Sequence, residues 1–304
     1  MLKQLLLFVS ITLLQRSFAQ TPVLFTDNGI STERNERDMA ISPDGHDMYY
    51  TLQTSRNILS TILHRTKEGN GWSKPEVAAF SGTFNDLEPA FSPDGKKLFF
   101  SSNRPSTGTQ TKDYDIWVME RTGSGWSDPK NIGSPINTPA NEFYPSIAQN
   151  GNLYFTAEKE NAVGNEDIFV SRRNGDGYTQ PVPMDTAVNS KLGEFNAFVA
   201  PDESYIIFSS YGRKDDAGGG DLYMSVNKNN QWQPAKNLRS INSATIDYCP
   251  FVYKGTLYFT SGRHSVTSSR QSRMDYNALM KWYDSPVNGS ENIYSVSFNE
   301  LKGN

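Results

Sequence analysis

Short runs of apolar residues recur along the chain at intervals of roughly fifty residues, and each run follows a turn. Proline presets one position of such a turn, and Asp with Gly supplies the left-handed one. The turn reads Ser42-Pro43-Asp44-Gly45 in the first copy and Ser92-Pro93-Asp94-Gly95 in the second, and it weakens in the later ones. Apolar runs of this length between turns are typical of strands buried on both faces. These strands are expected at Met48–Thr51, Leu98–Ser101, Leu153–Thr156, Ile206–Ser209 and Leu257–Thr260.

Each copy contains three further strand patterns around this run. An innermost strand precedes the turn, a third strand opens at an Asp-Ile-like step such as Asp115-Ile116, and a proline such as Pro129 opens an outer strand. Proline is tolerated at the edge of a sheet, which suits an outermost strand. Four strands in each of five copies predict an all-β fold, a five-bladed β-propeller of four-stranded antiparallel blades.

The fifth copy ends after its third strand, and the missing strand is available at the other end of the chain. Residues Pro22–Phe25 align with Pro75–Ala78, which form the outer strand of the first copy. We therefore expect the N-terminal strand to complete the last blade, giving one propeller domain over 20–304 with an insertion at 264–291. The alternative is a run of hairpins that never closes, although its open edges would invite aggregation.

The repeat resembles the WD40-like propeller repeat of the TolB type, which occurs in bacterial envelope proteins. The resemblance rests on Phe91–Arg104 followed by Asp115–Arg121, and it extends over nearly all of the chain after the first nineteen residues. Its residues form turns and packing contacts, so it implies a fold and a place in the cell envelope but little about activity. The same family includes propellers attached to serine peptidases and carrier proteins of the periplasm, and fold alone does not decide among such functions.

The first nineteen residues have the features of a secretory signal. Lys3 precedes an apolar stretch, Leu5–Leu14, and Ser17-Phe18-Ala19 predicts cleavage before Gln20 and a periplasmic or secreted protein. No later stretch is long enough to span a membrane. The single cysteine, Cys249, excludes internal disulfides, and we interpret it as a buried thiol. A net charge of −4 without a basic stripe argues against nucleic acid and anionic lipid as partners.

Two sets of loops, expected at one end of the channel, carry opposite charges. The loops that enter the inner strands carry acidic and polar residues, namely Glu36, Asp38, Asp86, Glu88, Glu142, Tyr144, Glu194 and Asn196, with Asp247 and Tyr248 in the fifth copy. The loops that leave the second strands carry one base each, at Arg56, Arg104, Lys159, Arg213 and Arg263.

Three interpretations of this rim remain open. The acids and bases could form structural ion pairs, as their repetition in every copy suggests. They could bind a polar ligand or Ca²⁺, for which carboxylate and amide oxygens are suitable ligands. They could also catalyse glycoside hydrolysis, with Asp38 and Glu88 as the carboxylate pair and Asp86 or Glu142 in support. Other hydrolases fit poorly, because no zinc-binding spacing of histidines and no Gly-x-Ser-x-Gly motif occurs.

The fifth copy alone carries a long insertion between its second and third strands. Met274, Ala278 and Trp282 recur there at helical spacing, which predicts a short amphipathic helix laid over the channel. Insertions on a rigid scaffold often carry binding functions. We hypothesise a lid or a partner-docking helix that uses Met274, Trp282 and Tyr283, and the alternative is a plug that only covers an apolar channel end.

These observations together predict a monomeric, non-catalytic binding module of the cell envelope that needs no cofactor. Its expected partner is an envelope protein or a small polar or carbohydrate ligand, bound at the rim that carries the acids, the bases and the insertion. The alternative function is that of a carbohydrate-active enzyme, a glycoside hydrolase that uses the rim carboxylates.

Overall fold

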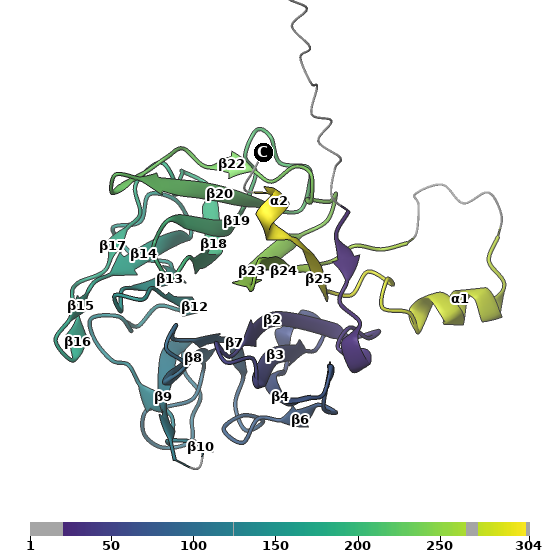
Figure 1. The fold of residues 1–304 in the computed structure, drawn as a ribbon, viewed down its shortest axis with the longest axis horizontal. Helices are drawn as coiled ribbons and strands as arrows, with labels where there is room; N and C mark the ends of the chain where they lie inside the picture. Colours follow the sequence, from purple (N-terminus) through teal and green to yellow (C-terminus); the bar gives the residue numbers. More distant parts are fainter. Residues whose placement is uncertain (1–20, 124, 266–272, 302–304) are drawn as a thin grey trace, which may run out of the picture.

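The computed structural model describes residues 21–123, 125–265 and 273–301. Five small antiparallel sheets surround a central axis, and the chain passes through them in order (Figure 1). The predicted five-bladed propeller is therefore confirmed. The predicted signal sequence lies outside the described residues. No helix within the described ranges has the length and apolar character needed to cross a membrane.

Each of the five blades begins with the strand nearest the axis. The first blade consists of β2 (Asn35–Ile41), β3 (Asp47–Gln53), β4 (Ser60–Glu68), β5 (Gly71–Trp72) and β6 (Glu76–Val77). The second consists of β7 (Asp86–Phe91), β8 (Lys97–Ser102), β9 (Asp115–Thr122), β10 (Gly125–Trp126) and β11 (Lys130–Asn131). The third consists of β12 (Glu142–Ile147), β13 (Leu153–Ala157), β14 (Asp167–Ser171) and β17 (Val182–Pro183), with the small hairpin β15 (Arg173–Asn174) and β16 (Gly177–Tyr178). The fourth consists of β18 (Gly193–Val199), β19 (Tyr205–Tyr211), β20 (Asp221–Lys228), β21 (Gln231–Trp232) and β22 (Lys236–Asn237).

The last blade joins the two ends of the chain. It consists of β23 (Asp247–Tyr253), β24 (Thr256–Ser261), β25 (Asn292–Ser297) and the N-terminal strand β1 (Val23–Leu24). β1 pairs antiparallel with β25, with Val23 opposite Ser295 and Leu24 opposite Tyr294. The predicted closure of the ring is confirmed, and the alternative of hairpins that never close is wrong. Short helical segments complete the fold at Asp27–Gly29 (η1), Ser55–Asn57 (η2), Tyr276–Tyr283 (α1) and Phe298–Leu301 (α2).

The core lies between neighbouring blades, where the second strands present their apolar faces. Phe100, Phe155, Phe208 and Phe259 occupy the same position in four blades, and each has an exposed fraction of 1% or less. Tyr50 takes this position in the first blade and is 2% exposed. Complete burial on both faces explains why the sequence of these strands is continuously apolar rather than alternating.

Each inner strand is interrupted at the same place. The pairing register of all five shifts at a β-bulge, for example between Arg37 and Ala40 in β2 and between Leu87 and Ala90 in β7. The residue in the bulge has a left-handed backbone with φ between 49° and 61°, which is uncommon for residues other than glycine. These residues are Asp38, Glu88, Tyr144, Asn196 and Cys249. A bulge re-aims a side chain, and such features often border functional sites.

The insertion in the last blade forms the predicted helix but not in the predicted place. α1 begins after Asp275, whose side chain caps the helix by accepting a hydrogen bond from the Ala278 amide at 2.8 Å. Figure 1 shows α1 outside the ring, beyond β25, and not over the channel. No residue of α1 is fully buried, and its apolar residues Leu279, Met280 and Trp282 are half-buried. The prediction of a lid or plug over the channel is therefore wrong.

Candidate functional site: two rings of residues around the channel

The residues that were expected on one rim form two concentric rings with different chemistry. The outer ring comprises the acid at or near the start of each inner strand, namely Glu36, Asp86, Glu142, Glu194 and Asp247. The inner ring comprises the bulge residue two positions later, namely Asp38, Glu88, Tyr144, Asn196 and Cys249. Every member of the outer ring is acidic, whereas the five members of the inner ring are all different.

Four acids of the outer ring form ion pairs with a base from their own blade. Asp86 lies 2.6 Å from Arg104, and Glu142 lies 2.8 Å from Lys159. Glu194–Arg213 and Asp247–Arg263 follow at 2.8 and 3.0 Å. All four acids are fully buried. Because the partners come from the strand end and the loop of one blade, the pairs hold that loop in place, which matches the structural interpretation of the rim charges.

The first blade lacks this pair. Arg56, the base expected there, has an exposed side chain within η2 and makes no ion pair with a described residue. Glu36 is 2% exposed, and among the described residues its carboxylate accepts hydrogen bonds from the amide and hydroxyl of Thr32 alone, at 3.1 and 2.5 Å. The expected ring of five bases therefore has four members in the described structure, since the loop after β3 turns outward at Thr54.

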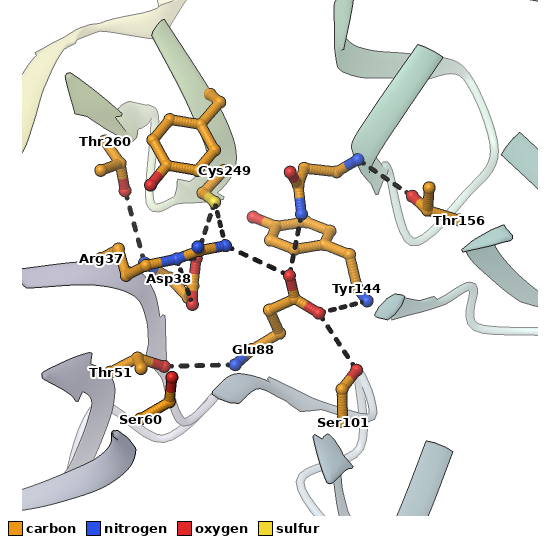
Figure 2. Close-up of polar contacts among 12 residues, drawn as sticks. Arg37, Asp38, Thr51, Ser60, Glu88, Ser101, Tyr144, Thr156, Cys249 and Thr260 are labelled. Carbon is orange, nitrogen blue, oxygen red and sulfur yellow. Dashed lines mark hydrogen bonds and ion pairs between the residues drawn. The ribbon is translucent and has the colours of Figure 1, made fainter. Parts of the chain in front are cut away.

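One residue that the sequence did not single out dominates the inner ring. The Arg37 side chain crosses the centre of the channel, as Figure 2 shows. Its Nε donates to both carboxylate oxygens of Asp38 at 2.8 Å, and its Nη2 donates to Glu88 Oε1 at 3.2 Å. Its guanidinium also lies over the ring of Tyr248, 4.9 Å from the centroid. One cation thus holds two buried carboxylates together.

The charge of Arg37 is secured by this environment. Burial alone would lower the pKa of Arg37, but the Asp38 carboxylate, followed by Tyr248, Cys249 and Glu88, raises that pKa well above its ordinary value. The cluster of Arg37, Asp38 and Glu88 therefore carries one positive charge and up to two negative charges. A guanidinium with five donors is suited to bridge two carboxylates in this way.

Glu88 is the most extensively bonded carboxylate of the inner ring. Besides Arg37, its oxygens accept hydrogen bonds from Asn196 Nδ2 at 3.1 Å, the Tyr144 amide at 2.7 Å and Ser101 Oγ at 3.0 Å (Figure 2). Complete burial, reinforced by the nearby Asp38 charge, nevertheless raises the pKa of Glu88 to about 7. Glu88 therefore connects blades 1, 2, 3 and 4 and titrates near neutral pH.

The remaining inner-ring residues close the centre of the channel. The Cys249 thiol lies 2.6 Å from Asp38 Oδ1, and the Tyr144 hydroxyl donates to the Pro250 carbonyl at 3.0 Å. Burial raises the pKa of Cys249 and Tyr144 well above their usual values. Cys249 thus remains a protonated thiol rather than a thiolate, and the thiolate is the reactive form.

Main-chain contacts between blades set these residues in place. In three blades, the main-chain amide of the bulge residue donates a hydrogen bond to a threonine hydroxyl on the second strand of the preceding blade in the ring, which for blade 1 is blade 5 (Figure 2). The pairs are Asp38 with Thr260 at 3.4 Å, Glu88 with Thr51 at 3.2 Å and Asn196 with Thr156 at 3.0 Å. The strained bulge conformations are therefore stabilised by neighbouring blades, which is how such strain persists.

The open part of the channel lies on the other side of the inner ring. A cavity with an empty volume of about 840 Å³, part of it open to solvent, extends from Glu88 and Tyr144 toward the turns that carry Pro43, Pro93 and Pro201. Apolar side chains from all five inner strands form most of its wall, among them Met39, Ile41, Ala90, Ile147, Phe198, Val199, Phe251 and Val252. The cavity is therefore an apolar tube with a polar, fully hydrogen-bonded floor.

Two features of this site were not predicted from the sequence, namely the central position of Arg37 and the place of Cys249 on the inner ring. Arg37 stands between Glu36 and Asp38, and it is the only base at the middle position of these inner-strand tripeptides, where the other blades have Leu87, Phe143, Phe195 and Tyr248. Aligning the tripeptides would have found it and would have placed Cys249, rather than Tyr248, on the inner ring. Within the described residues, no group of three or more His, Cys, Asp or Glu side chains is arranged to hold a metal ion.

Comparisons with known proteins identify the fold and no closer relation. No family model matches the sequence, and no curated protein matches it. Similar solved structures include a glycoside hydrolase with a TM-score of 0.56 and 8% identity, covering 93% of this chain and 91% of that one. The α-L-arabinofuranosidase PaAbf62A of Podospora anserina has a TM-score of 0.51 and 12% identity, with coverage of 91% and 96%. At such identities, the likeness is one of fold.

TolB from Acinetobacter baumannii is also among the similar structures, with a TM-score of 0.46 and 12% identity. The match covers 75% of this chain and 51% of TolB, so the chain spans about half the length of that protein. The structural neighbours thus include both TolB propellers and arabinofuranosidases.

Proposed function

We propose that this protein is a non-catalytic binding module of the cell envelope that binds its ligand in the channel. The observation that carries the proposal is the apolar cavity that opens on the turn side and ends at Glu88 and Tyr144. Concave, mostly apolar sites with a few fixed polar groups are the usual form of ligand pockets. The ligand we infer is an apolar molecule or an apolar peptide segment.

This proposal moves the binding end away from the acidic rim. Four outer-ring acids are bonded to bases of their own blades, and a ligand there would have to displace these pairs. The cavity, in contrast, offers apolar surface that a ligand can bury without breaking an ion pair. Burial of apolar surface contributes roughly 25 cal/mol per Å² before the costs of association.

The experiment that tests the site uses the neutral fluorophore N-phenyl-1-naphthylamine as a probe. Ala90 lines the cavity on β7, and Ala90→Trp would fill part of the tube. Ala217 is exposed in a loop of the fourth blade, and Ala217→Trp is the matched control. We expect the wild type and the control to enhance probe fluorescence and Ala90→Trp to lose most of that enhancement. Equal enhancement in all three proteins would contradict a channel site.

The alternative of a glycoside hydrolase is supported by the fold and by the closeness of Asp38 and Glu88 to one another through Arg37. Glycoside hydrolysis needs one carboxylic acid and one carboxylate that face the sugar across an open space. Here both carboxylates accept hydrogen bonds from Arg37, which favours binding over hydrolysis. Release of nitrophenol from an aryl α-L-arabinofuranoside, abolished by Asp38→Asn and by Glu88→Gln, would instead establish the enzyme.

Export to the envelope is part of the proposal and rests on the leader sequence and the TolB-type resemblance. We expect the protein recovered from periplasm or culture fluid to begin at Gln20. N-terminal sequencing of that protein tests this, and a mature protein that retains Met1 would refute export through a cleaved signal.

A further inference from the structure

A second cavity opens beside the channel, between blades 2 and 3. It has an empty volume of about 820 Å³, part of it open to solvent, and it shares Ser92, Pro93 and Ile147 with the wall of the channel cavity. It is also lined by Lys97 of β8 and by Arg173 of the β15–β16 hairpin. We call this cavity the side groove. The apolar channel therefore adjoins a compartment with two cationic side chains.

In the blade pair before this one, the same two positions form an ion pair. Arg121 of blade 2 lies opposite the aromatic residue that closes its hairpin, and it bonds Asp47 of blade 1 at 2.8 Å. Arg173 is the matching residue of blade 3, since it lies opposite Tyr178, which closes that hairpin. Lys97 is the matching residue of blade 2, because it begins β8 as Asp47 begins β3. Blades 1 and 2 thus place a base against an acid, whereas blades 2 and 3 place two bases.

At the remaining three interfaces, these two positions never hold two charges of the same sign. In the order of the blades, they hold Asn152 and Asn227, Tyr205 and Phe298, and Thr256 and Lys67. The rings of the second pair lie 4.9 Å apart, which shows that the two positions meet across an interface. Two bases beside one cavity repel each other, and an anion bound between them would remove that repulsion.

The present partners of the two bases leave them available to a ligand. Lys97 lies 3.3 Å from Glu120, and Arg173 lies 3.7 Å from Asp176. The side chain of the first acid is 59% exposed, and that of the second is fully exposed. Exposed ion pairs of this kind contribute little to stability, so an anionic ligand can replace them at small cost.

Apolar and polar groups complete the side groove. Phe99 and Tyr178 form part of its wall, and the guanidinium of Arg173 lies 5.4 Å from the Tyr178 ring centroid. Asp94 also lines the groove, but its carboxylate already accepts hydrogen bonds from Ser92 Oγ at 2.6 Å and from a main-chain amide two residues later at 3.0 Å. The groove therefore offers one guanidinium and one ammonium group beside apolar surface, and these cations are the usual partners of carboxylate and phosphate groups.

We propose that the side groove binds the anionic group of a small amphiphile whose apolar part occupies the channel. This inference rests on the proposed channel function and adds the charge and the class of the ligand. The volumes of the two cavities suit a small molecule, and together they place apolar surface next to two cations. A carboxylate, a phosphate and a sulfonate all suit the two bases, so the shared chemistry is one anionic group on an apolar body.

The test compares two fluorescent probes that differ in one anionic group. N-phenyl-1-naphthylamine is neutral, and 8-anilino-1-naphthalenesulfonate adds a sulfonate to the same ring system. We expect the wild type to bind the sulfonate about tenfold more tightly, as charge-assisted hydrogen bonds allow. Lys97→Gln with Arg173→Gln should remove this preference and leave the affinity for the neutral probe unchanged. Lys96→Gln with Arg172→Gln is the matched control, because it removes the same charge from neighbouring residues that do not line the groove.

Two further variants sharpen the test. Lys97→Asp copies Asp47 of blade 1, and its carboxylate should pair with Arg173 as Asp47 pairs with Arg121. We expect this variant to melt at a higher temperature than the wild type and to lose the preference for the sulfonate, which separates loss of the anion site from damage to the fold. Ala90→Trp, which fills the channel, should weaken the binding of both probes.

The outcomes distinguish this inference from the channel function on which it rests. If the wild type binds the neutral probe without preferring the sulfonate, or if the control variant loses the preference as well, the side groove is not an anion site and the channel site stands. Failure of the neutral probe to bind would overturn both. Sulfonate binding that Ala90→Trp leaves unchanged would overturn a shared amphiphile. Stronger displacement of the neutral probe by the peptide Ac-Leu-Leu-Glu-NH₂ than by decanoate would overturn a small molecule in favour of a protein segment.

Discussion

The outer and inner rings occupy neighbouring positions on the same five strands, yet the residue type is uniform among blades in the outer ring and differs from blade to blade in the inner ring. The outer ring has an acid in every blade and a matching base in four, as expected of a feature that stabilises the loops of the individual blade. The inner ring has a different residue in each blade, joined by bonds that cross from blade to blade. In a repeat protein, positions that keep one residue type in every repeat stabilise the individual repeat. Positions whose residue type differs between repeats can together form a single site to which all five blades contribute.

The largest expected effect comes from removing the cation of the inner ring. Arg37→Met leaves Asp38 and Glu88 buried without their shared base, and breaking a buried ion pair costs about 3–5 kcal/mol. The free energy of unfolding in urea should fall by that amount. The triple variant Arg37→Met, Asp38→Asn, Glu88→Gln should recover most of the loss, because it removes the charges together. A loss below about 1 kcal/mol in the single variant would show that the inner ring is solvated and not a closed network.

The second effect is a dependence of stability on pH to which Glu88 of the inner ring should contribute. The folded pKa of Glu88 is raised to about 7 from an ordinary value of 4.5. Below pH 4.5 the group is protonated in both states. Between these values the folded protein retains the proton that the unfolded chain has lost, so stability should fall as pH rises, by roughly 3 kcal/mol in total.

The comparison for this prediction is Glu88→Gln, which cannot titrate. The variant loses some hydrogen bonds and should be less stable at every pH, but its curve of unfolding free energy against pH should be flatter between 4.5 and 7. Chemical denaturation at several pH values measures this slope. An unchanged slope would assign the titration to another group, of which Glu166 is one, since burial beside Glu158 also raises its pKa to about 7.

The contrast between the rings also explains what the sequence could predict. Turn residues, buried aromatic residues and edge prolines act locally, so their spacing was enough to predict five blades and the closure of β1 on β25. The acids of the outer ring were found for the same reason, because each repeats. Arg37 was missed because its importance depends on contacts with Glu88 in the next blade and Cys249 in the last, which no local pattern records.

The position of α1 was unpredictable for a different physical reason. Met274, Ala278 and Trp282 correctly indicated a helix, but an amphipathic pattern does not specify which surface the helix will meet. The position of α1 is set by the segments that connect it to β24 and β25, through hydrogen bonds such as that from Asn288 Nδ2 to the Tyr283 carbonyl at 2.8 Å. Whether Met274, Trp282 and Tyr283 bind a partner stays a prediction.

A third and smaller effect should follow from breaking one pair of the outer ring. Arg213→Met leaves Glu194 buried and bonded only to uncharged groups, Ser190 and Ser210, much as Glu36 is bonded to Thr32 in blade 1. Since blade 1 folds with such an acid, we expect a loss of about 1–3 kcal/mol in unfolding free energy. Arg56→Met, in the corresponding loop of blade 1, is the control and should stay within about 0.5 kcal/mol of the wild type. If the two variants lose equal stability, the outer-ring pairs do not hold the blades together.

The smallest expected effect on stability lies outside both rings, on α1. Tyr276 and Tyr283 are 73% and 55% exposed, so Tyr276→Ser with Tyr283→Ser should change the unfolding free energy by less than about 0.5 kcal/mol each. Exposed aromatic residues on a helix are typical of a surface that binds another protein. If a partner docks there, the double variant should retain channel binding of the naphthylamine probe but lose capture of that partner. A marked loss of stability would instead mean that the tyrosines hold α1 against the propeller, and the insertion would then belong to the scaffold that the outer ring maintains.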